Sequence, residues 1–196
     1  MMPTPVPLDR AHATQARREQ IVQATIEVLA ERGYTGTTFD AICGHAGLSS
    51  KRLISYHFAS KDELLADVVA KVLTDAAAYM HPRIVAAGGP REKLATYIRS
   101  NVEFIAANPV QIRAVQQIAF NSAPAPDGSD DMALALLAEL FEQGRRAGEF
   151  RDFDARLMAM SLRATIDTVA ARLLAGLDAT VAAEELVTTF DLATRR

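Results

Sequence analysis

The sequence predicts an all-α fold of about nine helices, with a three-helix N-terminal domain followed by a larger helical bundle. Apolar residues recur at intervals of three and four from residue 17 onward, as they do on the buried face of a helix. No segment alternates apolar and polar residues in the way of a half-buried strand. The chain has 196 residues, of which 49% are hydrophobic, so it can bury a sizeable core.

The first periodic segment is residues 17–33, RREQIVQATIEVLAERG, whose apolar positions lie on one helical face. Gly33 can end this helix, because glycine adopts the left-handed backbone without a Cβ clash. The preceding residues, MMPTPVPLDR, are proline-rich and do not resemble a signal peptide. We therefore expect residues 1–14 to form a flexible arm.

Two short helices joined by a tight turn are predicted for TTFDAICGHAGLSSKRLISYHF, which begins at Thr37. Thr37 and Asp40 have the spacing of a capping box, so the first of these helices should start near Thr38. Gly47 can end it, and Ser49 can cap the next helix after a gap of about three residues. This arrangement is a helix-turn-helix.

The second helix of the pair combines an apolar anchor with a polar outer face. Ile54 and Phe58 are four residues apart and can attach it to a core. The residues left to face outward carry hydroxyl, cationic and phenolic groups: Ser50, Lys51, Arg52, Ser55 and Tyr56. Such groups make phosphate and base-edge contacts in DNA-binding proteins. Any helical hairpin on a surface shares these features, so a purely structural role is an open alternative.

A longer run, residues 17–65, resembles the N-terminal DNA-binding domain of the tetracycline-repressor (TetR) family of bacterial regulators. The motifs that carry the resemblance occur in order within the first third of the chain: Gly33-Tyr34, Thr37-Thr38, Ile42, Ala46-Gly47-Leu48-Ser49, His57-Phe58 and Lys61. Two features depart from the family pattern. Ser55 stands where an aromatic residue is usual, and one additional residue lies between Gly47 and Phe58.

The resemblance implies a DNA-binding domain at residues 15–60 and an effector-binding and dimerisation domain at residues 61–196. By matching positions, it also implies a set of DNA contacts: Thr37, Thr38, Ser49, Ser50, Lys51, Arg52, Ser55, Tyr56, His57 and Lys61. Arg52 is the candidate for a guanine edge, because its guanidinium can bond two acceptors. Lys61 would instead neutralise a phosphate.

The net charge of −3 does not by itself favour a nucleic-acid partner. Residues 1–62 carry seven Lys/Arg against six Asp/Glu, whereas the rest of the chain carries fourteen against eighteen. A DNA footprint would therefore have to come from basic residues that cluster on one face. We expect binding to depend strongly on salt concentration and to be modest for each monomer.

The chain after residue 60 is predicted to be helical throughout. The predicted helices are at residues 61–80, 91–107, 109–121, 130–148, 154–176 and 179–195. The first of these should end at His81-Pro82, because proline disfavours continuation of a helix. Asp154 and Asp178 are placed to cap the last two helices. Residues 122–129, SAPAPDGS, form the one predicted loop.

The helix at 154–176 has two apolar or small stripes where one would suffice for a surface helix. One stripe contains Met158, Leu162, Ile166, Val169 and Leu173, and the other contains Leu157, Ser161, Ala164, Thr165, Thr168 and Ala171. Burial of both requires a central position in the bundle or a partner subunit. The resemblance implies the second: a homodimer formed through this helix and the one at 179–195. Its two recognition helices, about 34–36 Å apart, would read a palindromic operator.

Catalytic and metal-binding patterns are not recognisable in the sequence. The histidines have no carboxylate and nucleophile at a catalytic spacing, and no glycine-rich phosphate loop occurs. Cys43 and His45 should point to different sides of a helix, which disfavours a metal site. The single cysteine excludes an internal disulfide and suits a reducing cytoplasm. No apolar run reaches the roughly 20 residues that span a bilayer. We expect no enzymatic activity, cofactor, metal ion or membrane partner.

Together with the resemblance, these observations predict a cytoplasmic transcriptional repressor that binds double-stranded DNA. The resemblance implies that an unknown small-molecule effector releases it. The candidate residues of the effector pocket are Phe104, Phe120, Met160, Arg163 and Asp167. Each of them also fits an ordinary role in the core or in a helix ion pair. Two alternatives stay open: a helical ligand-binding or enzymatic dimer whose helix-turn-helix is structural, and a transcriptional activator.

Overall fold

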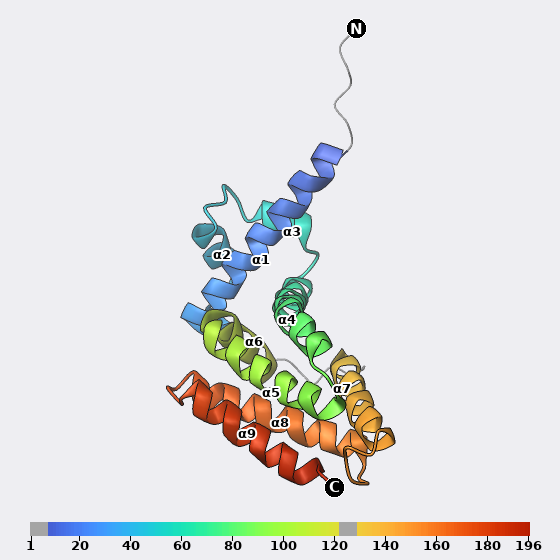
Figure 1. Cartoon of the computed structure of the whole chain (residues 1–196). Helices are drawn as coiled ribbons and strands as arrows, with labels where there is room; N and C mark the ends of the chain where they lie inside the picture. The colour runs from blue at the N-terminus through green and yellow to red at the C-terminus, as the bar shows by residue number, and fades with distance from the viewer. Residues whose placement is uncertain (1–7, 122–128) are drawn as a thin grey trace. The chain divides into compact units, whose positions relative to one another are not determined.

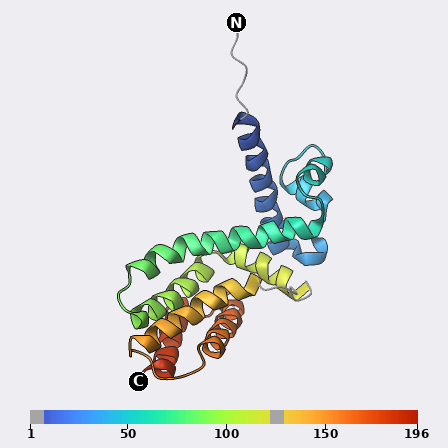
Figure 2. The same cartoon turned by 90° about the vertical axis from the view of Figure 1, so that its right-hand side faces the viewer.

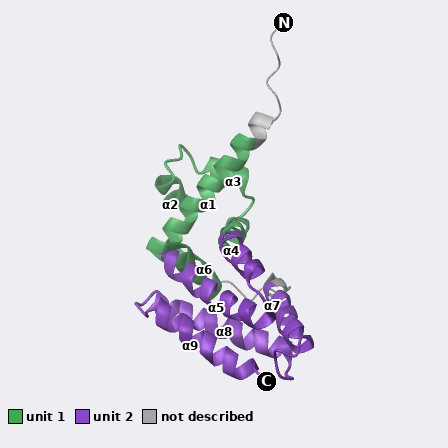
Figure 3. Ribbon diagram, in the orientation of Figure 1, with its two compact units in different colours: residues 1–73, 110–122 green, residues 74–109, 123–196 purple. Residues whose placement is uncertain are grey.

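The computed structural model describes residues 8–121 and 129–196, which form nine helices (Figure 1). They divide into two compact units (Figure 3). The first contains α1 (Leu8–Gly36), α2 (Phe39–His45), α3 (Arg52–His57), the first half of α4 (Lys61–Ala86) and α6 (Pro109–Asn121). The second contains the rest of α4, α5 (Pro90–Ala107), α7 (Ser129–Arg146), α8 (Ala155–Leu173) and α9 (Ala179–Thr194). The predicted all-α class is confirmed.

The core of the first unit is made by the apolar positions that the sequence periodicity places inward. Ile21 of α1, Ile42 of α2 and Ile54 of α3 are all fully buried. Phe58, directly after α3, and Leu64, in the first turn of α4, are buried with them. A helix as short as α3 is marginal by itself, so its position depends on this apolar anchor.

The start of α1 corrects the prediction of a flexible arm. α1 begins at Leu8, so residues 8–14 are helical. This stretch, LDRAHAT, contains no Gly or Pro, so it can extend the helix that follows it. Residues 1–7 of the predicted arm lie outside the described residues. Gly33 has φ +68° and interrupts α1 where the sequence predicted its end.

α2 begins where it was predicted to begin, but with a different cap. Its N-cap is Thr38, whose hydroxyl accepts a hydrogen bond from the Ala41 N–H at 3.1 Å. The predicted N-cap, Thr37, instead donates its hydroxyl proton to the Gly33 carbonyl at 2.8 Å. Thr37 therefore belongs to the end of α1 rather than to the start of α2.

The turn between α2 and α3 is longer than predicted. α3 starts at Arg52, so Ser49 is not its N-cap and the connection runs over residues 46–51. Ser50 takes a related role, because its hydroxyl accepts from the Arg52 N–H at 3.1 Å. Gly47, with φ +64°, makes the turn.

The second unit is a helical bundle in which α5 packs against α7, α8 and α9 (Figure 2). Its core includes Ile98 and Val102 of α5, Phe141 of α7 and Leu162 of α8. The predicted caps of α8 and α9 are confirmed. The Asp154 carboxylate accepts from the Leu157 N–H at 2.8 Å, and that of Asp178 accepts from the Val181 N–H at 2.9 Å.

α4 does not end at His81-Pro82 as predicted, but continues through Pro82 to Ala86. The ring of Pro82 removes the N–H that would bond the Ala78 carbonyl. Pro82 and Ala78 are both exposed, so water can bond the Ala78 carbonyl and the helix can continue. No helix among the described residues is long and apolar enough to cross a membrane.

Candidate nucleic-acid interface

α3 presents a polar face opposite its buried anchor. Ile54 and Phe58 are at most 1% exposed, which fixes the orientation of the short helix. The exposed side chains on this face are Lys51, Arg52, Ser55 and Tyr56. Tyr56 is 79% exposed, so both its ring and its hydroxyl are accessible. The structure therefore brings four of the predicted contacts together on one surface.

The two cations of this face have different surroundings. Lys51 Nζ lies 3.3 Å from the carboxylate of Asp40, in a pair that is mostly exposed. The guanidinium of Arg52 forms no hydrogen bond or ion pair with another described residue. The guanidinium of Arg52 can therefore bond two acceptors of a guanine edge. The ammonium of Lys51, by contrast, is paired with the carboxylate of Asp40.

The remaining predicted contacts before α3 differ in exposure. Thr38 and Ser49 are exposed, and Ser50 is half-buried. Thr37 is only 1% exposed and its hydroxyl is occupied by Gly33, so the structure contradicts its prediction as a DNA contact. The sequence could not separate Thr37 from Thr38, because either threonine can act as a helix N-cap.

His57 and Lys61 lie at the two ends of the connection from α3 to α4. His57 is half-buried, and its pKa is lowered first by burial and then by the charges of Arg18 and Arg17. Its imidazole is therefore neutral at pH 7. Lys61 Nζ donates to the Tyr34 carbonyl at 3.2 Å and lies 4.3 Å from the centroid of the Tyr34 ring. The ammonium of Lys61 thus already contacts the end of α1.

Two contacts between α1 and α2 support the interface, and the sequence did not predict them. His45 Nε2 lies 2.6 Å from the Glu27 carboxylate, whose pKa is lowered first by Gln23 and then by His45. Gln20 donates to the Ala46 carbonyl at 3.0 Å, at the end of α2. The amide of Gln20 thereby satisfies one of the carbonyls that have no partner within the helix at its C-terminal end.

The predicted effector-pocket residues differ in their exposure. Phe104 is buried and packs against Tyr79, with ring centroids 6.0 Å apart. Phe120 and Met160 are 80% and 49% exposed, so neither lines an enclosed cavity and both predictions are corrected. Their apolar character alone had suggested burial, but each lies on the outer face of its helix.

Arg163 and Asp167 form the helix ion pair that was the ordinary alternative for them. Nε of Arg163 lies 3.1 Å from both carboxylate oxygens of Asp167. Tyr97 of α5 lies beside this pair, and burial raises its pKa. A separate cleft of about 400 Å³ in the second unit is lined by Leu94, Ile98 and seven other residues, none of which was among the predicted pocket residues.

The second stripe of α8 is exposed, which excludes a position for α8 in the centre of its own bundle. Leu157 is 62% exposed, and Ala164 and Thr168 are exposed in the following turns. α9 has its own exposed apolar residues, Val181 at 57% and Leu192 at 53%. Small and apolar side chains at helical spacing thus remain uncovered on both helices.

Residues 21–68 match the sequence model of a family described as bacterial regulatory proteins, tetR family. The HTH-type transcriptional regulator BetI of Burkholderia lata is 32% identical over 90 residues, which are 45% of this chain and 46% of BetI. The chain therefore matches about half the length of such curated relatives.

Solved structures extend the similarity to most of the fold. A TetR-like transcriptional regulator from Rhodococcus sp. is 25% identical, with a TM-score of 0.67 over 88% of this chain and 92% of that one. AibR, solved in complex with isovaleryl coenzyme A and operator DNA, has the same fold, with 19% identity and a TM-score of 0.74 over 88% of this chain and 97% of that one. Residues 21–68 therefore form a DNA-binding segment of the kind found in the tetR family of bacterial regulatory proteins, and the described fold is similar to that of TetR-like regulators.

Proposed function

We propose that this protein is a transcriptional repressor that binds a palindromic operator as a homodimer and leaves it when a small molecule binds. The observation that carries the proposal is the outer face of α3, where Arg52 and Tyr56 are exposed opposite a fully buried Ile54. A helix anchored on one side and polar on the other can enter the major groove of DNA.

The proposed DNA contacts are the predicted ones without Thr37: Thr38, Ser49, Ser50, Lys51, Arg52, Ser55, Tyr56, His57 and Lys61. Arg52 reads a base edge, because its guanidinium has no partner in the described part of the chain and can bond guanine at two acceptors. Lys51 and Lys61 neutralise phosphates, after exchanging or sharing the contacts that they make with Asp40 and Tyr34.

The proposed dimer forms through the exposed stripes of α8 and α9. Leu157 and Val181 are each more than half exposed, and a second copy of the chain would cover them. A two-fold dimer carries two copies of α3 and therefore recognises two half-sites in inverted orientation.

The proposed effector acts through α4, because this helix contributes residues to both units. AibR was solved with isovaleryl coenzyme A, which makes acyl thioesters a reasonable first class of compounds to screen. An effector changes operator occupancy substantially if it favours one conformation by about 1–3 kcal/mol.

The proposed function is tested by selection from a random duplex library with purified protein at about 0.1 M salt, followed by sequencing of the bound DNA. We expect an enriched palindrome that competes with random DNA. A protein that is folded and dimeric but enriches no sequence would contradict the proposal and favour a helical ligand-binding protein. The position of the palindrome relative to a promoter then distinguishes repression from activation.

A further inference from the structure

Arg18 connects three helices of the first unit through one guanidinium group. Its Nη1 donates to the His57 carbonyl at 2.5 Å, and its Nη2 lies 2.7 Å from the Asp67 carboxylate. Both nitrogens also lie 3.3–3.4 Å from Glu63 Oε1. α1 is thereby joined to the last residue of α3 and to the first two turns of α4.

Residues that contact Arg18 also stabilise the turn between α3 and α4. The guanidinium carbon lies 4.2 Å from the centroid of the Phe58 ring, which is the buried anchor after α3. Glu63, besides bonding Arg18, accepts from the Ala59 N–H at 2.7 Å, and its own N–H donates to Ser60 Oγ at 3.1 Å. The turn from α3 to α4 is therefore bonded at both of its ends to the same group of side chains.

The electrostatics agree with this geometry. The carbonyl of His57 is at the C-terminal end of α3, where a cation is favoured by the helix dipole. The hydrogen bond to Asp67 is the main reason why the pKa of Arg18 is raised. The planar guanidinium carries several N–H donors and can bond a carbonyl and two carboxylates at the same time. A lysine ammonium is less suited to these three acceptors, because its donors are on a single nitrogen.

We infer that Arg18 is a positioning residue for operator recognition: it holds the recognition helix α3 in a defined orientation relative to the first turns of α4. The inference rests on the proposed function. Arg18 touches no base in this role, and it acts through His57, Glu63 and Asp67. A shift in the first turns of α4 would reach α3 through this residue.

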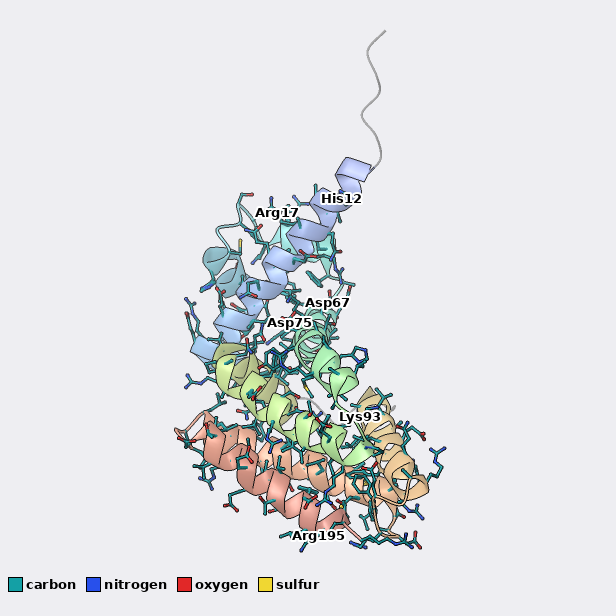
Figure 4. The ribbon with its side chains drawn as sticks, in the orientation of Figure 1. His12, Arg17, Asp67, Asp75, Lys93 and Arg195 are labelled. Atoms are coloured by element: carbon teal, nitrogen blue, oxygen red, sulfur yellow. The ribbon has the colours of Figure 1, made fainter. Side chains whose placement is uncertain are left out.

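Adjacent residues on α1 provide matched variants. Arg17 is exposed, and among the described residues its side chain bonds only Gln20 on the same helix, at 2.7 Å. Arg17→Gln therefore removes one charge and leaves the bonds of Arg18 in place. Arg18→Gln also removes one positive charge, but it breaks the bonds to His57, Glu63 and Asp67. Arg18→Lys keeps the charge and loses most of these bonds. Asp67→Asn removes an acceptor of Arg18; Figure 4 labels Asp67 and Arg17. Asp62→Asn is its control, because it also removes one negative charge from the beginning of α4.

The experiment measures the affinity of each full-length variant for the selected operator and for random duplex at equal salt. We expect Arg18→Gln and Arg18→Lys to bind the operator about tenfold more weakly than their charge-matched controls. The random-duplex affinity should be close to that of Arg17→Gln for Arg18→Gln, and close to that of the unsubstituted protein for Arg18→Lys. Asp67→Asn should also bind the operator more weakly, although loss of a negative charge alone would strengthen binding. If Arg18→Lys binds like the unsubstituted protein and Arg18→Gln binds like Arg17→Gln, Arg18 supplies only charge and the inference is wrong.

Hydrogen exchange in the absence of DNA tests the same inference independently of the proposed function. Amides of α3 and of the turn before α4 should exchange faster in Arg18→Lys than in Arg17→Gln. Equal exchange in these two variants would overturn the inference even if both bind DNA. Faster exchange together with a failure of the unsubstituted protein to select any duplex would contradict the proposed function while leaving the connection itself supported.

Discussion

At the scale of single residues, Arg52 and Lys51 should make separable contributions to DNA binding. The guanidinium of Arg52 has no partner among residues 8–121 and 129–196, whereas the ammonium of Lys51 is paired with Asp40. We expect Arg52→Ala to cost about 1–3 kcal/mol on the selected operator and to relax base preference at one position of each half-site. Lys51→Ala should weaken binding to operator and random DNA alike and reduce the salt slope.

Competition between operator variants at several salt concentrations checks both expectations. A substitution in a cation without a base contact changes the salt slope but not the ranking of operator variants. If Arg52→Ala leaves that ranking unchanged, Arg52 is a phosphate contact and the assignment of base recognition to it is wrong.

His57 should make the stability of the first unit depend on pH. Its pKa is lowered in the folded chain, so below its unfolded value of about 6.5 the unfolded chain binds more protons. Its contribution to stability is therefore complete above this pH and is lost as the pH falls toward the folded pKa. We expect the drop in Tm between pH 7.5 and pH 5 to be smaller in His57→Gln than in the unsubstituted protein. His12→Gln, at an exposed position on α1, is the control and should leave the drop unchanged.

At the scale of secondary-structure elements, the N-cap of α2 is a local determinant of stability. The hydroxyl of Thr38 bonds the Ala41 N–H, which has no partner within the helix. Thr38→Ala should lower the free energy of unfolding by about 1 kcal/mol, whereas Thr38→Ser keeps an accepting hydroxyl and should lower it much less. Urea denaturation followed by circular dichroism measures both. Equal losses in the two variants would show that the cap bond contributes nothing.

The positions of the helices could be predicted from apolar periodicity, whereas their ends were predicted less accurately. Ile54 and Phe58 were placed in the core by spacing alone, and Asp154 and Asp178 were recognised as caps by residue type. The prediction that α4 ends at Pro82 was wrong. A proline is tolerated inside this helix because it is exposed, and its exposure depends on packing that the local sequence does not encode.

Contacts between elements could not be predicted in the same way. Arg18 and His57 are 39 residues apart in sequence, and His45 and Glu27 are 18 apart. Whether such residues meet depends on how the helices cross, which the periodicity of each helix does not encode. The polar face of α3 was predictable because it lies within one element, whereas the group that positions this face was not.

At the scale of the whole molecule, the proposed second subunit would cover apolar residues that one chain leaves exposed. A chain of this size can cover the apolar face of each helix, yet α8 and α9 keep Leu157, Val181 and Leu192 more than half exposed. The predicted pocket residue Met160 lies among the exposed residues of α8, so its apolar character suits a subunit interface better than a ligand cavity. Sequence periodicity identified this second stripe but could not decide what covers it.

A charge in this stripe should therefore separate the subunits. Ala164 is exposed near the middle of α8, and in the proposed dimer Ala164→Glu would place a carboxylate between two copies of the helix. We expect the dimer dissociation constant, measured by sedimentation equilibrium, to rise at least about tenfold, and operator affinity to fall with it because a monomer engages one half-site. Ala106→Glu, at an exposed position of α5 outside the stripe, should change neither quantity. A dimer of undiminished stability in Ala164→Glu would place the subunit contact on another face of the protein.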